Sequence, residues 1–365
     1  MFFSLLAACS ESPGIYHDLV PPSAPVETIE RTWATAEVEL LQGRGELTLD
    51  VPSNTQGIFV AVTGVRNAEY LVHELEGPDG VVVQSGASAE QLAFGLGAAT
   101  GPFFSPNRSV GDHGGTTLLV PNDPRIRLSP GSWRMGLLST LDRTHRVRVD
   151  WVVSQAQHRP AATRLPLNIY LSGAGGMTLD QGLDHERLSR ALALLERVYA
   201  QVDVEFSPIQ LHAVSESFAQ LQGIDLRSEE ALELLAEGVG NEGVNLFVIE
   251  RFEDEDDLLG TVGGVSAAIP GDPRGGAALS GVVVASSFSD ADPQQDLLGV
   301  TMAHEIGHFL GLFHSEEAAG FQDNIGDTPM GDGQNLMHYH SRPSFTDLTP
   351  HQGMVVRIHP SMVAP

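Results

Sequence analysis

The chain has 365 residues, and 42% of them are hydrophobic, so two domains with their own cores are expected. Asp and Glu total 47 against 20 Lys and Arg, which gives a formal net charge of −27. Binding to nucleic acid needs a basic surface, so this charge argues against nucleic acid as a partner. Gly and Pro are abundant at 39 and 22 residues, and aromatic residues make up only 6%, a mixture that favours strands and turns.

The N-terminal segment carries the only cysteine of the chain, Cys9, so no intrachain disulfide framework exists. The string Leu6-Ala7-Ala8-Cys9 matches a bacterial lipobox, in which the cysteine becomes lipidated after cleavage. The segment before the cysteine is short and contains no Lys or Arg, which is unusual for a signal peptide. The alternative is an ordinary hydrophobic N-terminus with an incidental cysteine. We predict a lipoprotein signal segment at residues 1–9.

Residues 10–30 include the string P-P-S-A-P and show little hydrophobic periodicity, so they are predicted to be a flexible tether. No stretch of about 18 apolar residues follows, so contact with a membrane is expected only through the lipid anchor. These features predict an extracytoplasmic protein, attached to the bacterial cell envelope or secreted. Ser10 after the cysteine favours the outer membrane.

Short alternating runs of apolar and polar residues separated by turn residues fill residues 31–155, and no long amphipathic helix interrupts them. This pattern predicts an all-β sandwich as an accessory domain. A linker is expected at 156–164. The predicted strands are Glu37–Leu41, Glu46–Val51, Gly57–Val65, Gly80–Gln84, Ser132–Leu137 and Arg146–Val153.

Residues 165–365 are predicted to form a second domain in which strands alternate with helices, as in a three-layer α/β fold. One helix is expected with Asp184 as its N-cap, and Asp292-Pro293 is expected to open another. The part after Gly311 is predicted to be a small irregular lower subdomain, with a cleft between it and the upper sheet. The predicted strands are Leu167–Leu171, Val204–Phe206, Val244–Ile249 and Gly281–Ala285, and the predicted helices are His185–Gln201 and Glu229–Glu237.

The most informative string is H-E-I-G-H-F-L-G-L-F-H at residues 304–314. His304 and His308 are one helical turn apart, so both project from one face and can bind one zinc ion. Glu305 lies beside such a metal and can act as general base toward a water activated by zinc. Gly311 tolerates the left-handed conformation that ends a helix, so the chain can turn back and bring His314 as third ligand. Three histidines leave a zinc position open, as catalysis requires.

The string N-L-M-H-Y follows, and Met337, 23 residues after His314, is predicted to form an apolar floor under the zinc. With this methionine, the segment from about residue 165 to the end resembles a metzincin zinc peptidase and is most similar to the pappalysin-like branch. The similar strings are at residues 304–314, 327–329 (D-T-P), 335–339 and 348–354 (L-T-P-H-Q-G-M). This chain departs from such relatives in having no cysteine pair to brace the domain.

The resemblance implies an α/β metzincin catalytic domain with one catalytic zinc, acting on a protein or peptide substrate. It places Tyr339 near the zinc, either as a ligand of the resting metal or as a group that stabilises the oxyanion. It also implies that an antiparallel edge strand, expected at residues 263–270, binds the substrate backbone by β-augmentation. The alternative is that this segment is a plain loop or edge strand without substrate contact.

The loop after His314 is rich in carboxylates, and its acidic residues are Glu316, Glu317, Asp323, Asp327 and Asp332. Clustered carboxylates suit calcium, and relatives of the pappalysin type use calcium near this point. We name Asp323 and Asp327 as the calcium candidates. A solvated acidic loop in a very acidic protein is the equal alternative.

The expected activity is therefore hydrolysis of peptide bonds by a zinc-dependent endopeptidase with Glu305 as general base and then acid. Two other classes of function stay open. One is a catalytically inactive zinc-binding lipoprotein that serves adhesion or interaction, against which the intact Glu305 argues. The other is a metallohydrolase that acts on amides of cell-wall peptide.

Overall fold

The computed structural model describes residues 29–84, 112–156, 162–253, 262–274, 279–287, 297–316, 323–329, 331 and 333–365. The lipobox with Cys9, nearly all of the predicted tether, and Asp292-Pro293 lie outside the described residues. No helix of the described part is long and apolar enough to cross a membrane.

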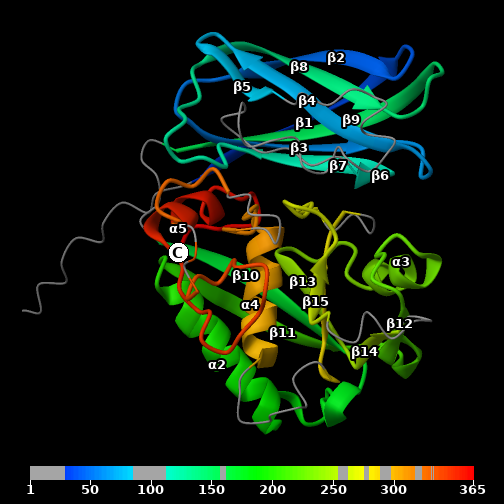
Figure 1. Ribbon diagram of the computed structural model, residues 1–365, viewed down its shortest axis with the longest axis vertical. Helices are drawn as coiled ribbons and strands as arrows, with labels where there is room; N and C mark the ends of the chain where they lie inside the picture. The colour runs from blue at the N-terminus through cyan, green and yellow to red at the C-terminus, as the bar shows by residue number, and fades with distance from the viewer. Residues whose placement is uncertain are drawn as a thin grey trace, which may run out of the picture.

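The N-terminal part consists of two antiparallel sheets that pack face to face (Figure 1). One sheet has the strand order β1 (Glu30–Leu40), β9 (His145–Gln155), β3 (Thr55–Thr63) and β7 (Gly115–Val120). The other has the order β2 (Arg44–Val51), β8 (Gly131–Ser139), β4 (Glu69–Gly77) and β5 (Gly80–Gln84), and β6 (Asp112–His113) pairs with β4. The sequence pattern missed β4 and β7, and it made β1 seven residues too short at its start.

The C-terminal part is a mixed α/β unit built on a five-stranded sheet. The strand order is β11 (Val204–Ala213), β10 (Thr163–Leu171), β13 (Val244–Ile249), β16 (Val282–Ala285) and β15 (Gly264–Ser266). The first four strands are parallel, and β15 runs antiparallel to β16 at the edge, as predicted for this segment. A two-stranded sheet of β12 (Gln220–Gln222) and β14 (Arg251–Glu253) lies beside it.

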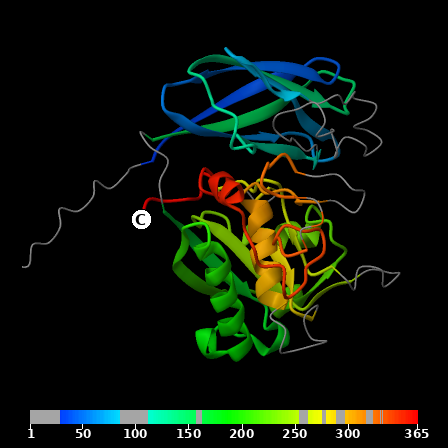
Figure 2. The ribbon, with the colours of Figure 1, turned by 60° about the vertical axis from the view of Figure 1, so that its left-hand side comes forward.

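Helices cover both faces of this sheet, because its buried strands are apolar on both sides. Leu246 and Val248 of β13 pack into one core with α2 (Glu186–Ala200) and α4 (Leu297–Phe309). Phe247 and Ile249 point the other way and pack into a second core with α3 (Glu229–Ala236). The predicted three-layer arrangement is confirmed, and Figure 2 shows α4 held between the sheet and the C-terminal segments.

Two local predictions for this unit were wrong. The N-cap of α2 is His185 rather than Asp184, because Asp184 is taken into a preceding 3-10 turn, Gly182–Asp184. The region after Gly311 is not wholly irregular, because α5 (Pro350–Val356) lies within it. Its start is a capping box. The Thr349 hydroxyl accepts from the backbone N–H of Gln352, and the side-chain Oε1 of Gln352 accepts from the backbone N–H of Thr349.

The two parts share one hydrophobic core across their junction. Strand β3 alternates, so that Ile58, Val60 and Val62 face the inside of the sandwich while Phe59 and Ala61 face the α/β unit. Both views show the sheet of β1, β3, β7 and β9 lying against the α/β unit near α5 (Figures 1 and 2). The face of an antiparallel sheet that commonly meets water is therefore buried here.

Candidate metal centre

Helix α4 carries the first three residues of the site and is buried along almost its whole length. It packs closely on α2 because Gly299 has no side chain; a Cβ at Gly299 would lie 2.8 Å from the Ala191 carbonyl oxygen. The Tyr199 hydroxyl of α2 donates to the Ala303 carbonyl at 2.9 Å, directly before His304. The position of α4 is thus fixed by both packing and a buried hydrogen bond.

The end of α4 is set by Gly311, whose φ is +99°. The Gly311 N–H donates to the His308 carbonyl at 2.9 Å, and the Leu312 N–H donates to the Gly307 carbonyl at 2.9 Å. This pair of bonds is a Schellman motif, which needs a residue with a left-handed conformation at the end of the helix. The chain reverses there and brings His314 back toward the helix.

The structure brings His304, His308 and His314 into one cluster, with their ligand atoms all within 4.8 Å of one another. The His314 Nε2 atom lies 3.3 Å from His304 Nε2 and 3.1 Å from His308 Nε2. Two nitrogens bound to one tetrahedral zinc at ordinary distances lie about 3.3 Å apart. Within the described residues, this is the one group of three or more metal-binding side chains close enough to hold an ion.

Backbone carbonyls orient two of the three rings. The Nδ1 atom of His304 lies 2.7 Å from the Leu336 carbonyl, and the Nδ1 atom of His308 lies 2.7 Å from the Leu312 carbonyl. Each Nδ1 must therefore carry the proton, which leaves the Nε2 lone pair for a metal. Burial lowers the pKa of His304 to about 4, which keeps the ring neutral. The donor set fits zinc.

Glu305 is 7% exposed and lies next to the edge strand β15. A Cβ on Gly264 would lie 2.6 Å from Glu305 Cγ, so only glycine lets the strand come this close. Burial raises the pKa of Glu305 to about 8, opposed by an interaction with the backbone of Ser266. A cation at the three histidines would favour the ionised carboxylate.

Met337 lies beneath the histidines and is fully buried. A Cβ on Gly307, between the two helical histidines, would lie 2.5 Å from Met337 Sδ. Asn335 fixes this turn, because its Oδ1 accepts from the Met337 N–H at 2.9 Å and its Nδ2 donates to Gln352 Oε1 at 3.0 Å. The sequence reasoning missed Asn335 and Gln352, although both stand in strings it had singled out.

Tyr339 is partly exposed, and its ring lies 4.6 Å from that of His338 and 4.2 Å from that of His340. These contacts place it in the loop that follows Met337. They give it neither of the two roles predicted for it, so its role stays a prediction.

Both calcium candidates accept hydrogen bonds, Asp323 from its own loop and Asp327 from the start of α5. Asp323 Oδ1 accepts from the Ile325 N–H at 3.1 Å and from the Thr328 hydroxyl. Asp327 accepts from the Thr349 hydroxyl at 2.7 Å and from the His351 N–H at 3.0 Å, which ties the loop to the start of α5. Glu317 and Asp332 lie outside the described residues. The calcium site stays a prediction.

Comparison with known proteins agrees with this geometry. Residues 197–360 match the family described as Metallo-peptidase family M12B Reprolysin-like. The match and the histidine cluster support a metzincin-like metallopeptidase domain in the C-terminal part of the chain. A search of curated proteins gave no match.

Among solved structures, the chain is similar to the crystal structure of metalloproteinase-II from Bacteroides fragilis. The identity is 16%, and the similar region covers 54% of this chain and 52% of that chain, about half of each. The TM-score is 0.32, so the two structures share too little geometry for a comparison of function.

Proposed function

We propose that this protein is a zinc-dependent endopeptidase of the metzincin type, closest in character to the pappalysin-like branch. The observation that carries the proposal is the convergence of three histidine Nε2 atoms beside the buried carboxyl of Glu305. The strings D-T-P at 327–329 and T-P-H-Q at 349–352 support the branch, because they resemble strings that pappalysin-like enzymes carry before and after the corresponding methionine. When bound, zinc supplies a Lewis acid that polarises the scissile carbonyl and makes water a better nucleophile.

The side chains of the site bind the metal and transfer protons. His304, His308 and His314 hold the metal through Nε2. Glu305 accepts a proton from the attacking water and donates one to the leaving amine. Burial raises the pKa of Glu305 to about 8, and a cation at the histidines would lower it, which favours the carboxylate that accepts the first proton. The resemblance places Tyr339 near the zinc, and we propose that it either binds the resting metal or donates a hydrogen bond to the developing oxyanion.

The proposed substrate is an extended peptide segment that pairs with β15. This strand pairs with β16 on one side, and no strand of the described part pairs with its other edge. Main-chain groups of Gly264–Ser266 are therefore suited to receive a peptide by β-augmentation. A peptide paired there passes beside Glu305, which packs on Gly264.

The proposal is tested with purified full chain and an internally quenched peptide. We expect cleavage that is lost after treatment with a chelator and restored by adding zinc alone. The reason is that the three histidines bind the metal on which the reaction depends. Peptide cleavage that survives complete removal of metal would contradict a zinc mechanism.

We also propose that the protein is a lipoprotein anchored at Cys9 on the outside of the cell. The support is the string Leu6-Ala7-Ala8-Cys9 and the polar, Pro-containing segment after it. Two or more acyl chains on one cysteine give stable attachment, whereas one chain is marginal. The Cys9→Ser variant is therefore expected to stay uncleaved or to leave the membrane fraction.

Cell fractionation and mass spectrometry of the N-terminal peptide measure this directly. Zinc content should not change in Cys9→Ser, which serves as the control for folding. Wild-type protein found in the soluble fraction with Cys9 as a free thiol would end the lipoprotein proposal and leave the peptidase proposal intact.

A further inference from the structure

We propose that the N-terminal β-sandwich positions the candidate metal centre, with Leu119 of β7 as the main positioning residue. The inference rests on the proposed function, in that the three histidines are taken to bind zinc. It goes beyond that function because it makes the sandwich part of the metal site rather than a separate accessory domain.

Strand β7 is buried on both faces, which is the first observation behind the proposal. Leu118 and Leu119 are each 1% exposed, but they belong to different cores. Leu118 packs inside the sandwich, and Leu119 packs into the core of the α/β unit together with residues of α4. Neighbouring residues of one strand thus serve two separate tasks.

Leu119 contacts the turn that ends the metal-binding helix. A Cβ on Gly311 would lie 2.9 Å from Leu119 Cδ2, so the leucine side chain lies directly on this glycine. Gly311 closes the end of α4 at His308, and the next residue, Leu312, offers the carbonyl that orients the His308 ring at 2.7 Å. Leu119 therefore packs on the turn whose Leu312 carbonyl orients the ring of His308. The same turn leads the chain to His314.

A second contact from β7 reaches the same helix end. The Thr117 hydroxyl donates to the Pro270 carbonyl at 2.5 Å. The following N–H, that of Gly271, donates to the Phe309 carbonyl at 2.8 Å, at the last residue of α4. A carbonyl at a helix C-terminus has no partner within the helix, so the segment that β7 holds supplies one.

A buried histidine outside the metal site fills the space between the two parts. His359 has its ring 5.9 Å from Phe59 of β3 and 5.2 Å from Phe309 of α4. Its Nε2 lies 3.1 Å from the Gly271 carbonyl, and its Nδ1 accepts from the Ser361 N–H at 3.2 Å. Burial lowers the pKa of His359 to about 3, so the ring is neutral and acts as packing between sandwich and helix.

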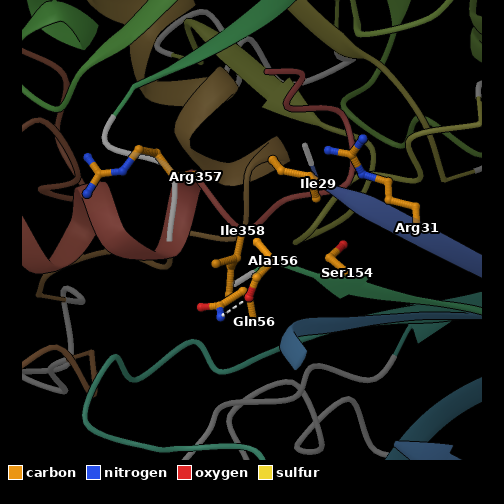
Figure 3. A pocket seen from close by; sticks show the side chains of 7 residues that line it. All are labelled: Ile29, Arg31, Gln56, Ser154, Ala156, Arg357 and Ile358. Carbon is orange, nitrogen blue, oxygen red and sulfur yellow. Dashed lines mark hydrogen bonds between the residues drawn. The ribbon is translucent and has the colours of Figure 1, made fainter. Parts of the chain in front are cut away.

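The junction is tightly packed beyond these contacts. Figure 3 shows Gln56 and Ala156 of the sandwich close to Ile358, which follows α5, and the cavity that these residues help to line has a volume of about 10 Å³. A Cβ on Gly57 would lie 3.3 Å from Ile358 Cβ. An interdomain ion pair joins Arg274 Nη1 to Asp150 at 3.0 Å. A junction of this kind transmits position, because packed side chains leave little room for movement.

The test compares Leu119→Ala with Leu118→Ala in the full chain. Both variants remove the same atoms from the same strand at equal burial, but Leu118→Ala leaves its cavity inside the sandwich and Leu119→Ala leaves its cavity in the core that contains α4. Cobalt(II) affinity and the visible spectrum of the cobalt form are measured with the metal alone. We expect Leu119→Ala to lower cobalt affinity by about 10- to 100-fold, the usual effect of losing a group that orients a ligand, and to change the spectrum.

Leu118→Ala should lower the melting temperature comparably while leaving cobalt affinity and spectrum as in wild type. Leu119→Met should restore both, because it conserves volume. If Leu119→Ala does not fold, the smaller truncation Leu119→Val should lower cobalt affinity in the same direction. Equal cobalt affinity in the two alanine variants, or no rescue by methionine, would overturn the proposal. The readout is metal binding and not cleavage, so a chain that cleaved no peptide would refute the proposed function and leave this result to stand.

Discussion

The His308→Ala, His314→Ala double variant is expected to lose its zinc, whereas wild-type protein should carry about one zinc per chain. The structure gives the reason, since the two Nε2 atoms lie 3.1 Å apart and His304 alone offers a single nitrogen. Elemental analysis after desalting measures the content. The matched control is His145→Ala, His212→Ala, which removes two histidines from β9 and β11.

The control variant should keep full zinc content. If the double variant at the site retained as much zinc as wild type, the metal would have to be held elsewhere in the chain, and the assignment of the three histidines would be wrong.

Glu305→Gln is expected to keep the fold and the zinc but to lower kcat by about 10²- to 10⁴-fold, the range for loss of a positioned acid–base group. The amide is nearly the same size as the carboxyl, so it fits the close contact with Gly264. It cannot accept the proton that the attacking water must lose. Steady-state kinetics on a quenched peptide, with zinc content measured on the same sample, gives the comparison.

Glu205→Gln is the matched control, because it changes one exposed carboxylate of β11 in the same way. It should show wild-type kinetics. A Glu305→Gln variant that cleaved peptide at the wild-type rate would remove Glu305 from the mechanism, even if the zinc site were intact.

The local parts of the site could be predicted from sequence because helix geometry alone sets them. The spacing of His304 and His308 places both rings on one face, and Gly311 marks the turn that brings His314 back. Strand β13 was predicted with its observed bounds, Val244–Ile249, whereas only the first three residues of β11 (Val204–Ala213) were predicted as a strand. Short apolar runs between turn signals are typical of strands covered on both faces.

The same burial explains a strand that the sequence pattern missed. Strand β7 (G-T-T-L-L-V) is buried at every position, so it does not alternate as a strand with one solvated face would. The strands of this domain were predicted from alternating runs, and this segment has no such alternation. Only the packing of β7 against Gly311 shows why both faces are apolar.

Contacts between distant residues were beyond the sequence. Asn335 and Gln352 are 17 residues apart and exchange two hydrogen bonds under the metal site, yet neither has a local pattern that pairs them. Asp327 was named as a calcium candidate from the clustered carboxylates and the resemblance to pappalysin-like enzymes, whereas its bonds to the Thr349 hydroxyl and the His351 N–H depend on where α5 lies. Such pairings are set by tertiary packing, which composition and spacing do not encode.

The most direct test of the proposed peptidase function is a cleavage profile on a complex peptide mixture, with new N-termini identified by mass spectrometry. Wild-type chain, Glu305→Gln and chelated wild type are compared on the same mixture. We predict new internal N-termini in the wild-type sample that are absent from the other two, as expected for an endopeptidase that needs both zinc and Glu305. A zinc-loaded wild-type sample that produced no new N-termini would contradict the endopeptidase function.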